Sequence, residues 1–257
     1  MSLKLCSLSS GSRGNCIIVA SDTTTLLIDA GIAVSSIVKG LKLLNLENPS
    51  VLITHSHSDH VANLPYLSKK LNPNVYCHED SYYAVNQHIK GGELIAVSGD
   101  FFVGDLTVSP FAVSHDVPCV GYSIYNDGRK ISIVTDLGKV DENVERALSG
   151  SDIVFIEANH DEKLLRGNRN YSEALKKRIL SNRGHLSNEE CGRLLGRIVS
   201  SGVKQIVLGH LSSDNNRPRL AFEAVERELG RAGAEVGRDV GMAIALCGRA
   251  SNLFEVN

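Results

Sequence analysis

The first half of the chain alternates short apolar runs with polar turns, and this pattern predicts strands. Runs of β-branched and apolar residues bounded by glycine, serine or aspartate are typical of strands buried in a sheet. We expect such strands at Leu3–Leu8, Cys16–Ala20, Thr24–Ile28, Val51–Ile53 and Asn74–Cys77. Apolar residues at helical spacing predict helices at Ser35–Leu46, from Asp59 to about Leu71, and at Glu79–Ile89.

The second half begins with strands alone and then alternates helices with strands. We first expect strands at Leu94–Val97, Phe101–Val103, Leu106–Val113, Val120–Tyr125 and Lys130–Val134, the last two joined by the hairpin turn Asn126-Asp127-Gly128. Helices are then expected at Val140–Leu148, Tyr171–Leu180, Asn188–Ser200 and Asn216–Arg231, and strands at Ile153–Glu157, Gln205–Leu208, Gly241–Cys247 and Leu253–Val256. Ser187, followed three residues later by Glu190, forms a capping box before the third of these helices.

Short connections join the predicted elements throughout the chain. The sequence has no internal repeat of 20–50 residues and no low-complexity linker. We therefore expect a single domain that covers residues 1–257.

The most informative polar segment follows the strand Val51–Ile53 and carries three histidines and one aspartate within six residues. His55 and His57 lie two apart on extended backbone, so their side chains point the same way. Asp59 and His60 fall in the first turn of the next helix. Imidazole and carboxylate groups are ligands of zinc, manganese and iron, and two adjacent pairs can serve two metals. The alternative is a polar turn rich in histidine, but only nine histidines occur in 257 residues, which argues against chance.

Further ligand side chains follow other predicted strands, where sites form in α/β sheets. Each of these residues, taken alone, is more often a turn residue. Together they complete a site with His55, His57 and His115 in one nest, Asp59, His60 and His210 in a second, and Asp136 bridging both. Asp29 also ends a strand, and we interpret it as a carboxylate that holds a ligand histidine in place.

Neither nest contains a thiolate, and this composition favours a hydrolytic site for phosphoesters over a structural zinc site. Two divalent ions, zinc or manganese with iron also possible, would hold a bridging hydroxide as the nucleophile. We count Asp59 among the catalytic residues as well as among the ligands.

Composition and charge narrow the classes of protein that fit. Hydrophobic residues make up 42% and charged residues 22% of the chain, as in an ordinary globular protein. The net charge of −2 excludes a global polycation, although Lys163–Arg197 holds nine basic and three acidic residues. This segment could follow a nucleic-acid backbone through Lys176 and Arg178. The alternative is an ordinary solvated helix face.

The six cysteines are scattered and form no C-x-x-C pair, so the sequence predicts neither a metal finger nor a disulfide framework. Reduced thiols in a cytoplasmic protein fit this distribution. We find no charged start followed by a long apolar core, and no apolar run of membrane-spanning length. We therefore expect a cytoplasmic protein without a membrane partner. Its oligomeric state does not follow from the sequence.

The motifs resemble those of the metallo-β-lactamase superfamily. Asp29, the H-x-H-x-D-H segment, His115, Asp136 and His210 match its five motifs in order. Four other segments are similar to the YycJ/WalJ-type branch, which resembles ribonuclease Z and the cyclic phosphodiesterases: Ser10–Cys16, Glu157–Asp161, Gly184–Asn188 and Gly209–Pro218. The resemblance implies an α+β fold, a four-layer αββα sandwich of two mixed sheets. It also implies phosphodiester hydrolysis, with a 5′-to-3′ DNA exonuclease role.

His185 precedes the capped helix and is the strongest candidate for acid catalysis. In ribonuclease Z-like relatives a histidine in a similar context protonates the leaving alkoxide, a task that suits histidine near neutral pH. The alternative is a residue that merely approaches the helix. We also expect His160, Ser12 and Asn15 near the substrate or behind the ligands, and note that Tyr171-Ser172 replaces a tyrosine-proline pair expected from the resemblance.

Two other functions remain open on the sequence alone. The first is hydrolysis of a small cyclic phosphate, a thioester or a lactam. The second is a regulatory or binding protein whose metal site is vestigial, which the complete ligand set argues against.

Overall fold

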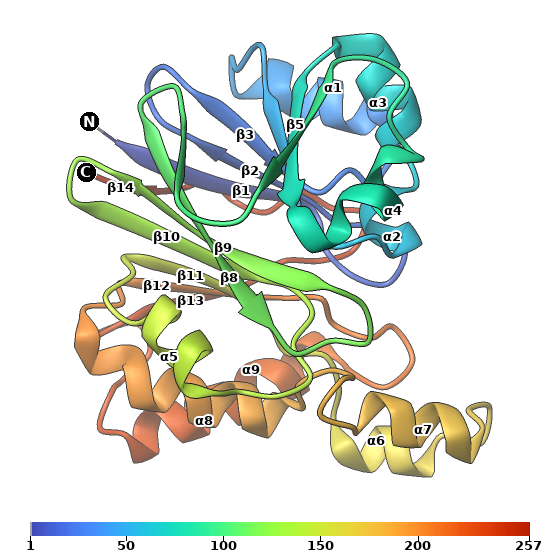
Figure 1. Ribbon diagram of the computed structural model, residues 1–257. Coiled ribbons are helices and arrows are strands. Elements are labelled where there is room, and N and C mark those ends of the chain that lie inside the picture. Colours follow the sequence, from blue (N-terminus) through green and yellow to red (C-terminus); the bar gives the residue numbers. More distant parts are fainter. Residues whose placement is uncertain (1) are drawn as a thin grey trace.

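The computed structural model describes residues 2–257 as two seven-stranded sheets that stack face to face between layers of helices (Figure 1). The first sheet has the order β14-β1-β2-β3-β4-β5-β6, and the second has the order β13-β12-β11-β10-β9-β8-β7. Both sheets are mixed, with antiparallel pairs on one side and parallel pairs on the other. The predicted four-layer α+β sandwich is confirmed.

The first sheet contains β1 (Leu3–Ser9), β2 (Cys16–Ala20), β3 (Thr25–Ile28), β4 (Ser50–Ile53), β5 (Asn74–His78), β6 (Glu93–Val97) and β14 (Phe254–Val256). Its helices are α1 (Val34–Leu43), α2 (Ser58–Val61), α3 (Leu64–Leu71) and α4 (Tyr82–Asn86), with the 3₁₀ turn η1 (Glu79–Ser81). Strand β14 pairs with β1 and so brings both ends of the chain together, at the left of Figure 1.

The second sheet contains β7 (Phe101–Val103), β8 (Leu106–Val113), β9 (Cys119–Asn126), β10 (Arg129–Val134), β11 (Ile153–Glu157), β12 (Gln205–Gly209) and β13 (Gly241–Ile244). Its outer face carries α5 (Glu142–Leu148), α8 (Asn188–Ile198) and α9 (Pro218–Arg231), with the 3₁₀ turn η2 (Val199–Ser201) after α8. Two short helices, α6 (Glu162–Gly167) and α7 (Glu173–Ile179), project from the body at the lower right of Figure 1.

Strand β2 shows why the central strands read as unbroken apolar runs. Ile17 and Val19 face the core between the two sheets, whereas Cys16, Ile18 and Ala20 face the core under α1 and α3. Successive side chains on a strand point to opposite faces, so a strand covered on both faces needs apolar residues at every position. Burial on both sides is therefore the physical cause of the pattern seen in the sequence.

Several helix boundaries differ from the prediction. The helix expected from Asp59 to Leu71 is two helices, because Pro65 lies in the first turn of a new helix after Asn63. The segment Glu79–Ile89 forms the short turn η1 and a helix that ends at Asn86. The six-residue helix α6 was not predicted, since it is too short to show an apolar period.

Strands of both sheets have their carboxyl ends at one edge of the molecule, and six of these strands lead into the residues of the site. The carboxyl ends of β3 and β4 come from the first sheet, and those of β8, β10, β11 and β12 come from the second. Loops that follow these strands therefore meet between the sheets. Within residues 2–257, none of the helices combines the length and the apolar character that a membrane span requires.

Candidate metal centre

The predicted ligands gather where the six strands end. Their potential ligand atoms lie within 4.8 Å of one another in overlapping groups: His55 with His57 and His115, Asp59 with His60 and His210, and His55 with His60 and Asp136. These groups reproduce the two nests and the shared aspartate expected from the sequence. The role of the residues as ligands remains a prediction.

Two histidines of the first nest are oriented by groups behind them. The Nδ1 of His55 lies 3.0 Å from the Thr54 hydroxyl, and the Nδ1 of His115 lies 3.2 Å from the Gly184 carbonyl oxygen. Both contacts leave Nε2 as the nitrogen that can face a metal. The Nε2 of His55 is buried and makes no hydrogen bond within the described residues, which costs free energy unless an ion binds it.

His57 has the opposite ring orientation, with Nδ1 and not Nε2 facing the other two histidines. Its Nε2 lies 3.2 Å from the Asp116 carboxylate, and its Nδ1 lies 3.3 Å from Nε2 of His115. The inward nitrogens of His55, His57 and His115 therefore converge on one point. A divalent cation fits this set of neutral nitrogen donors.

The second nest is more acidic. Nε2 of His60 lies 3.1 Å from Asp136 and 3.3 Å from Asp59, and Nε2 of His210 lies 3.3 Å from the same Asp59 oxygen. The nearest Asp136 oxygen is buried and not aligned for a hydrogen bond, so the atoms are placed as ligands around an ion would be. Burial raises the pKa of Asp136, but the surrounding histidines, His210 first, hold it well below its usual range.

Asp29 lies directly behind His60. One carboxylate oxygen lies 2.6 Å from Nδ1 of His60, and the other accepts a hydrogen bond from the Thr54 amide at 2.9 Å. Asp29 adopts φ 64°, a left-handed conformation that is rare for residues other than glycine. This geometry is the one expected of a carboxylate that fixes a ligand histidine, and that role stays a prediction.

His185 forms a pair with Glu157 beside the second nest. Its Nδ1 lies 2.9 Å from the Glu157 carboxylate, whose other oxygen accepts hydrogen bonds from the amides of Leu137 at 2.7 Å and Leu186 at 3.1 Å. Burial lowers the pKa of His185, but the Glu157 charge outweighs it and raises that pKa above its usual value.

Glu157 was not predicted as a site residue. It ends β11 at the same edge as the ligands and is completely buried. The signal available in the sequence was this strand-end position, which had identified Asp136 and His210. An acidic residue at the end of a strand is ambiguous until its partner across the loop is known.

A cavity of about 220 Å³ opens above the ligands. It is lined by Ser12, His57, Asp59, Asp136, Asn159, Tyr171, Leu175, Arg178, Ile179, His185, His210 and Ser212. Two predicted substrate residues, Ser12 and Arg178, therefore lie at the cavity. Helix α7 and the residue before its cap supply one wall, and the metal ligands supply the floor.

Three other predicted substrate residues do not line this cavity. The Asn15 amide nitrogen lies 3.1 Å from Nε2 of His60 and 3.3 Å from the Asp59 carboxylate, so it contacts the ligands of the second nest. His160 is buried, and neither of its ring nitrogens makes a hydrogen bond within the described residues. Lys176 turns away and donates to the carbonyl oxygen of Arg166 at 3.0 Å and to Glu173 at 2.9 Å. Their substrate roles remain predictions.

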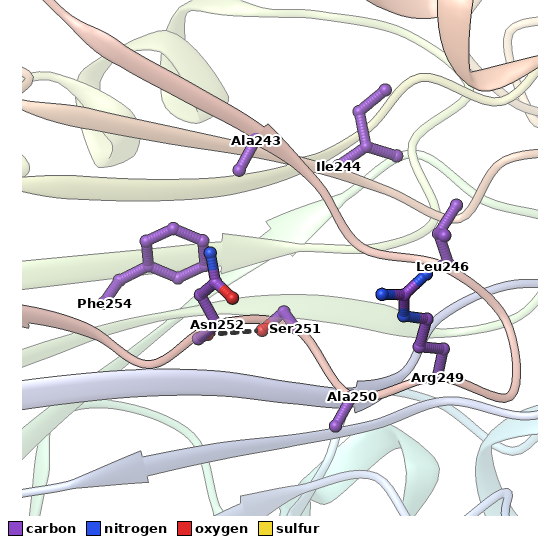
Figure 2. A pocket seen from close by; sticks show the side chains of 8 residues that line it. All are labelled: Ala243, Ile244, Leu246, Arg249, Ala250, Ser251, Asn252 and Phe254. Atoms are coloured by element: carbon purple, nitrogen blue, oxygen red, sulfur yellow. Dashed lines mark hydrogen bonds between the residues drawn. The ribbon is translucent and has the colours of Figure 1, made fainter.

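A second cavity, of about 150 Å³, lies between β13 and the segment that leads into β14 (Figure 2). Arg249 is the one charged side chain among the eight that line it. No cluster of histidine and carboxylate groups faces this cavity within residues 2–257. The chemistry of the protein is therefore concentrated at the other site.

The chain matches a known family at both the sequence and the structural level. The family model of the β-lactamase superfamily domain matches residues 24–211. The fold is similar to that of the metallo-β-lactamase fold protein YhfI from Bacillus subtilis, with a TM-score of 0.74 at 16% identity over 100% of both chains. Fold and family define a metal-dependent hydrolase.

Two curated relatives narrow the class. The chain is 35% identical to exodeoxyribonuclease YycJ of Bacillus anthracis, over 92% of this chain and 93% of that protein. It is 34% identical to exodeoxyribonuclease WalJ of Streptococcus pneumoniae, over 90% of each. The chain therefore belongs to the β-lactamase superfamily and, within it, to the family of YycJ and WalJ.

Proposed function

We propose that the protein is a two-metal phosphodiesterase that degrades DNA exonucleolytically from a 5′ end in the cytoplasm. The observation that carries the proposal is the pair of thiolate-free nests that share Asp136 and lie beside the His185–Glu157 pair. The names of the two relatives support DNA as the substrate. The six cysteines, none of them in a disulfide, support a reducing compartment.

Zinc or manganese suits the two nests best, and iron is compatible with the same donors. We assign His55, His57 and His115 to one ion, Asp59, His60 and His210 to the other, and Asp136 to both. Two bound divalent ions neutralise the oxygens of a phosphodiester and lower the pKa of water toward neutrality.

The protein's own contribution is to orient the substrate and to move a proton. Glu157 holds Nδ1 of His185, so Nε2 is the ring nitrogen turned away from that carboxylate. We infer that this nitrogen passes its proton to the leaving oxygen of the scissile phosphodiester as a general acid. Asp59 borders the cavity and keeps its charge there, because hydrogen bonds from His210 and His60 outweigh burial and lower its pKa.

Helix α7 is expected to contact the substrate. Leu175 and Ile179 present apolar side chains to the cavity, four residues apart on one face of the helix, and Ser12 adds a hydroxyl from the opposite loop. An apolar wall above a charged floor fits a nucleotide, because the sugar and base meet the wall while the phosphate meets the floor.

The proposal is tested with end-labelled DNA and a His185→Ala variant, assayed with Mn²⁺, Zn²⁺ and Mg²⁺. We expect wild-type protein to release labelled nucleotides from the 5′ end with at least one of these ions. His185→Ala should lower the turnover number by about 10²–10⁴-fold while DNA affinity and metal content stay unchanged. A variant that loses DNA binding but keeps turnover would contradict the general-acid assignment.

Two further measurements distinguish DNA from a small substrate. Affinity for long DNA should fall as salt rises, since each contact with a phosphate releases counterions. Turnover of bis-p-nitrophenyl phosphate without any turnover or salt-sensitive binding of DNA would instead favour a small phosphodiester.

A further inference from the structure

Arg178 of α7 is paired with an acidic residue of the site. Its Nε lies 2.8 Å from Oδ2 of Asp116, and a second guanidinium nitrogen contacts the same oxygen. The other Asp116 oxygen lies 3.2 Å from Nε2 of His57 and 3.3 Å from Nε2 of His115. This second oxygen forms no aligned hydrogen bond within the described residues, and Asp116 therefore lies in contact between α7 and two predicted metal ligands, His57 and His115.

His57 differs from the other histidines in what stands behind it. Thr54 and Asp29, which orient His55 and His60, are buried in the interior. The Asp116 side chain is 28% exposed and the Arg178 side chain is 55% exposed. A carboxylate at the protein surface can adopt several rotamers, so it needs a further partner to keep it in contact with His57.

We propose that Arg178 and Asp116 are positioning residues that fix His57 for metal binding and so couple α7 to the first metal site. This inference rests on the proposed two-metal centre. It differs from the prediction that Arg178 binds substrate directly. Two of the three guanidinium nitrogens of Arg178 contact Asp116. The cavity is also lined by Leu175 and Ile179 of α7 and by Tyr171 just before this helix. A substrate that holds α7 in place therefore also holds His57.

The test measures metal affinity, not activity. Wild-type, Asp116→Asn and Arg178→Met proteins are prepared metal-free and titrated with Zn²⁺ against a chromophoric chelator. Loss of the group behind a ligand histidine typically weakens binding of the ion by about 10–100-fold. We expect this loss for one of the two ions in both variants and no change for the other. The double variant should be no weaker than Asp116→Asn, because Arg178 acts through Asp116.

Lys177→Met is the matched control. Lys177 is the neighbouring residue on α7, is exposed, and carries the same charge without touching the cavity. It should bind both ions like wild type. Arg178→Lys keeps the charge but not the planar fork and should give an intermediate affinity.

Other outcomes would overturn the inference. If Arg178→Met bound both ions normally but bound DNA more weakly, Arg178 would be a substrate contact. Normal binding of both ions by Asp116→Asn would also contradict the inference. If circular dichroism shows that Asp116→Asn is unfolded, Asp116→Glu is titrated in its place. The number of ions on wild-type protein tests the proposed centre separately, since fewer than two would contradict that centre whatever the variants do.

Discussion

At the scale of single residues, the site is defined by the groups behind the histidines. Thr54, Asp29 and the Gly184 carbonyl oxygen contact Nδ1 of His55, His60 and His115 and leave Nε2 of these rings pointing inward, whereas Asp116 contacts Nε2 of His57. An imidazole has two different nitrogens, and the hydrogen bond made by one decides which of them is available to a metal. The convergence of nitrogens in the first nest is therefore fixed by these outer contacts.

The Glu157–His185 pair gives a prediction at this scale. Glu157→Gln removes the negative charge behind His185. The two carboxylate oxygens of Glu157 accept three hydrogen bonds, whereas a glutamine offers only one oxygen as an acceptor. We expect turnover of DNA to fall by about 10²–10⁴-fold, the range for general-acid catalysis. The comparison is made on protein saturated with metal, because Glu157 also lies 3.5 Å from Nδ1 of the predicted ligand His210. Steady-state kinetics and metal analysis check this.

The matched comparison for this prediction is the double variant. If Glu157 acts through His185, then Glu157→Gln with His185→Ala should turn over DNA no more slowly than His185→Ala alone. Fully additive losses would show that Glu157 has an independent role.

Gly31 gives a second prediction, because the Asp59 backbone packs directly against it. A Cβ atom on Gly31 would come within 1.7 Å of the Asp59 carbonyl oxygen. Gly31→Ala must therefore displace the ligand loop, and overpacking of this kind costs about 1–3 kcal/mol. We expect a lower free energy of unfolding and weaker metal binding, measured by urea unfolding and chelator titration.

Gly99→Ala is the control for Gly31, since nothing lies within 4 Å of the added Cβ. Its stability and metal affinity should match wild type. Equal effects of the two substitutions would show that loss of backbone freedom, and not the contact with Asp59, is responsible.

At the scale of elements, the capped helix α8 positions His185. The Ser187 hydroxyl accepts a hydrogen bond from the Glu190 amide, and the Glu190 carboxylate accepts one from the Ser187 amide. The capping box predicted from the sequence is therefore confirmed. Because His185 lies two residues before the cap Ser187, the start of this helix determines where the imidazole sits.

Ser187→Ala should lower the free energy of unfolding by about 0.5–2 kcal/mol, because it leaves a helix N–H group without its cap. Ser172→Ala is a matched control, since Ser172 caps α7 in the same way but α7 buries no residue. Urea unfolding should show the smaller loss for Ser172→Ala. A larger loss for Ser172 would mean that α7 contributes more to stability than its exposure indicates.

The elements also show how far the sequence predicted the fold. Central strands such as β2, β11 and β12 were placed to within one residue, because burial on a sheet leaves an apolar run in the sequence. The arm formed by α6 and α7 was predicted less well. Its helices are short and exposed, so end caps such as Asp161 define them more than an apolar period does.

At the scale of the whole molecule, one apolar core joins the two sheets. Leu5 and Ile17 from the first sheet pack in the same cluster as Tyr122 and Phe155 from the second. We propose that residues 1–257 form one domain for this reason, since neither sheet can bury its inner face alone.

Asp152 links three strands of the second sheet and gives a pH prediction. It accepts hydrogen bonds from the Lys130 amide at 2.9 Å and the Lys204 ammonium at 2.7 Å. Burial raises the pKa of Asp152, but these contacts outweigh it and lower that pKa below the ordinary value. A carboxyl group with a lowered folded-state pKa stabilises the fold at pH values above its unfolded pKa of about 4, and this stabilisation disappears as the pH falls through the folded pKa.

Asp152→Asn should therefore lower the free energy of unfolding by about 1–3 kcal/mol at pH 7, and by less below pH of about 4. Urea unfolding followed by circular dichroism at several pH values measures this difference. Asp100→Asn is the control, because Asp100 is exposed and forms no hydrogen bond or ion pair within the described residues. A difference between Asp152→Asn and wild type that does not change with pH would contradict the assignment.

The residue pattern predicted the strands and seven candidate ligands, and the resemblance implied the sandwich. The residue pattern did so because ligands cluster at strand ends and buried strands are apolar. Which nitrogen of each histidine faces inward follows from the folded structure alone, as do the contacts of Glu157 with His185 and of Asp116 with His57. Asp116 and His57 are 59 residues apart, and Glu157 and His185 are 28 apart. Their contacts arise where loops from different strands meet, and no local pattern records that meeting.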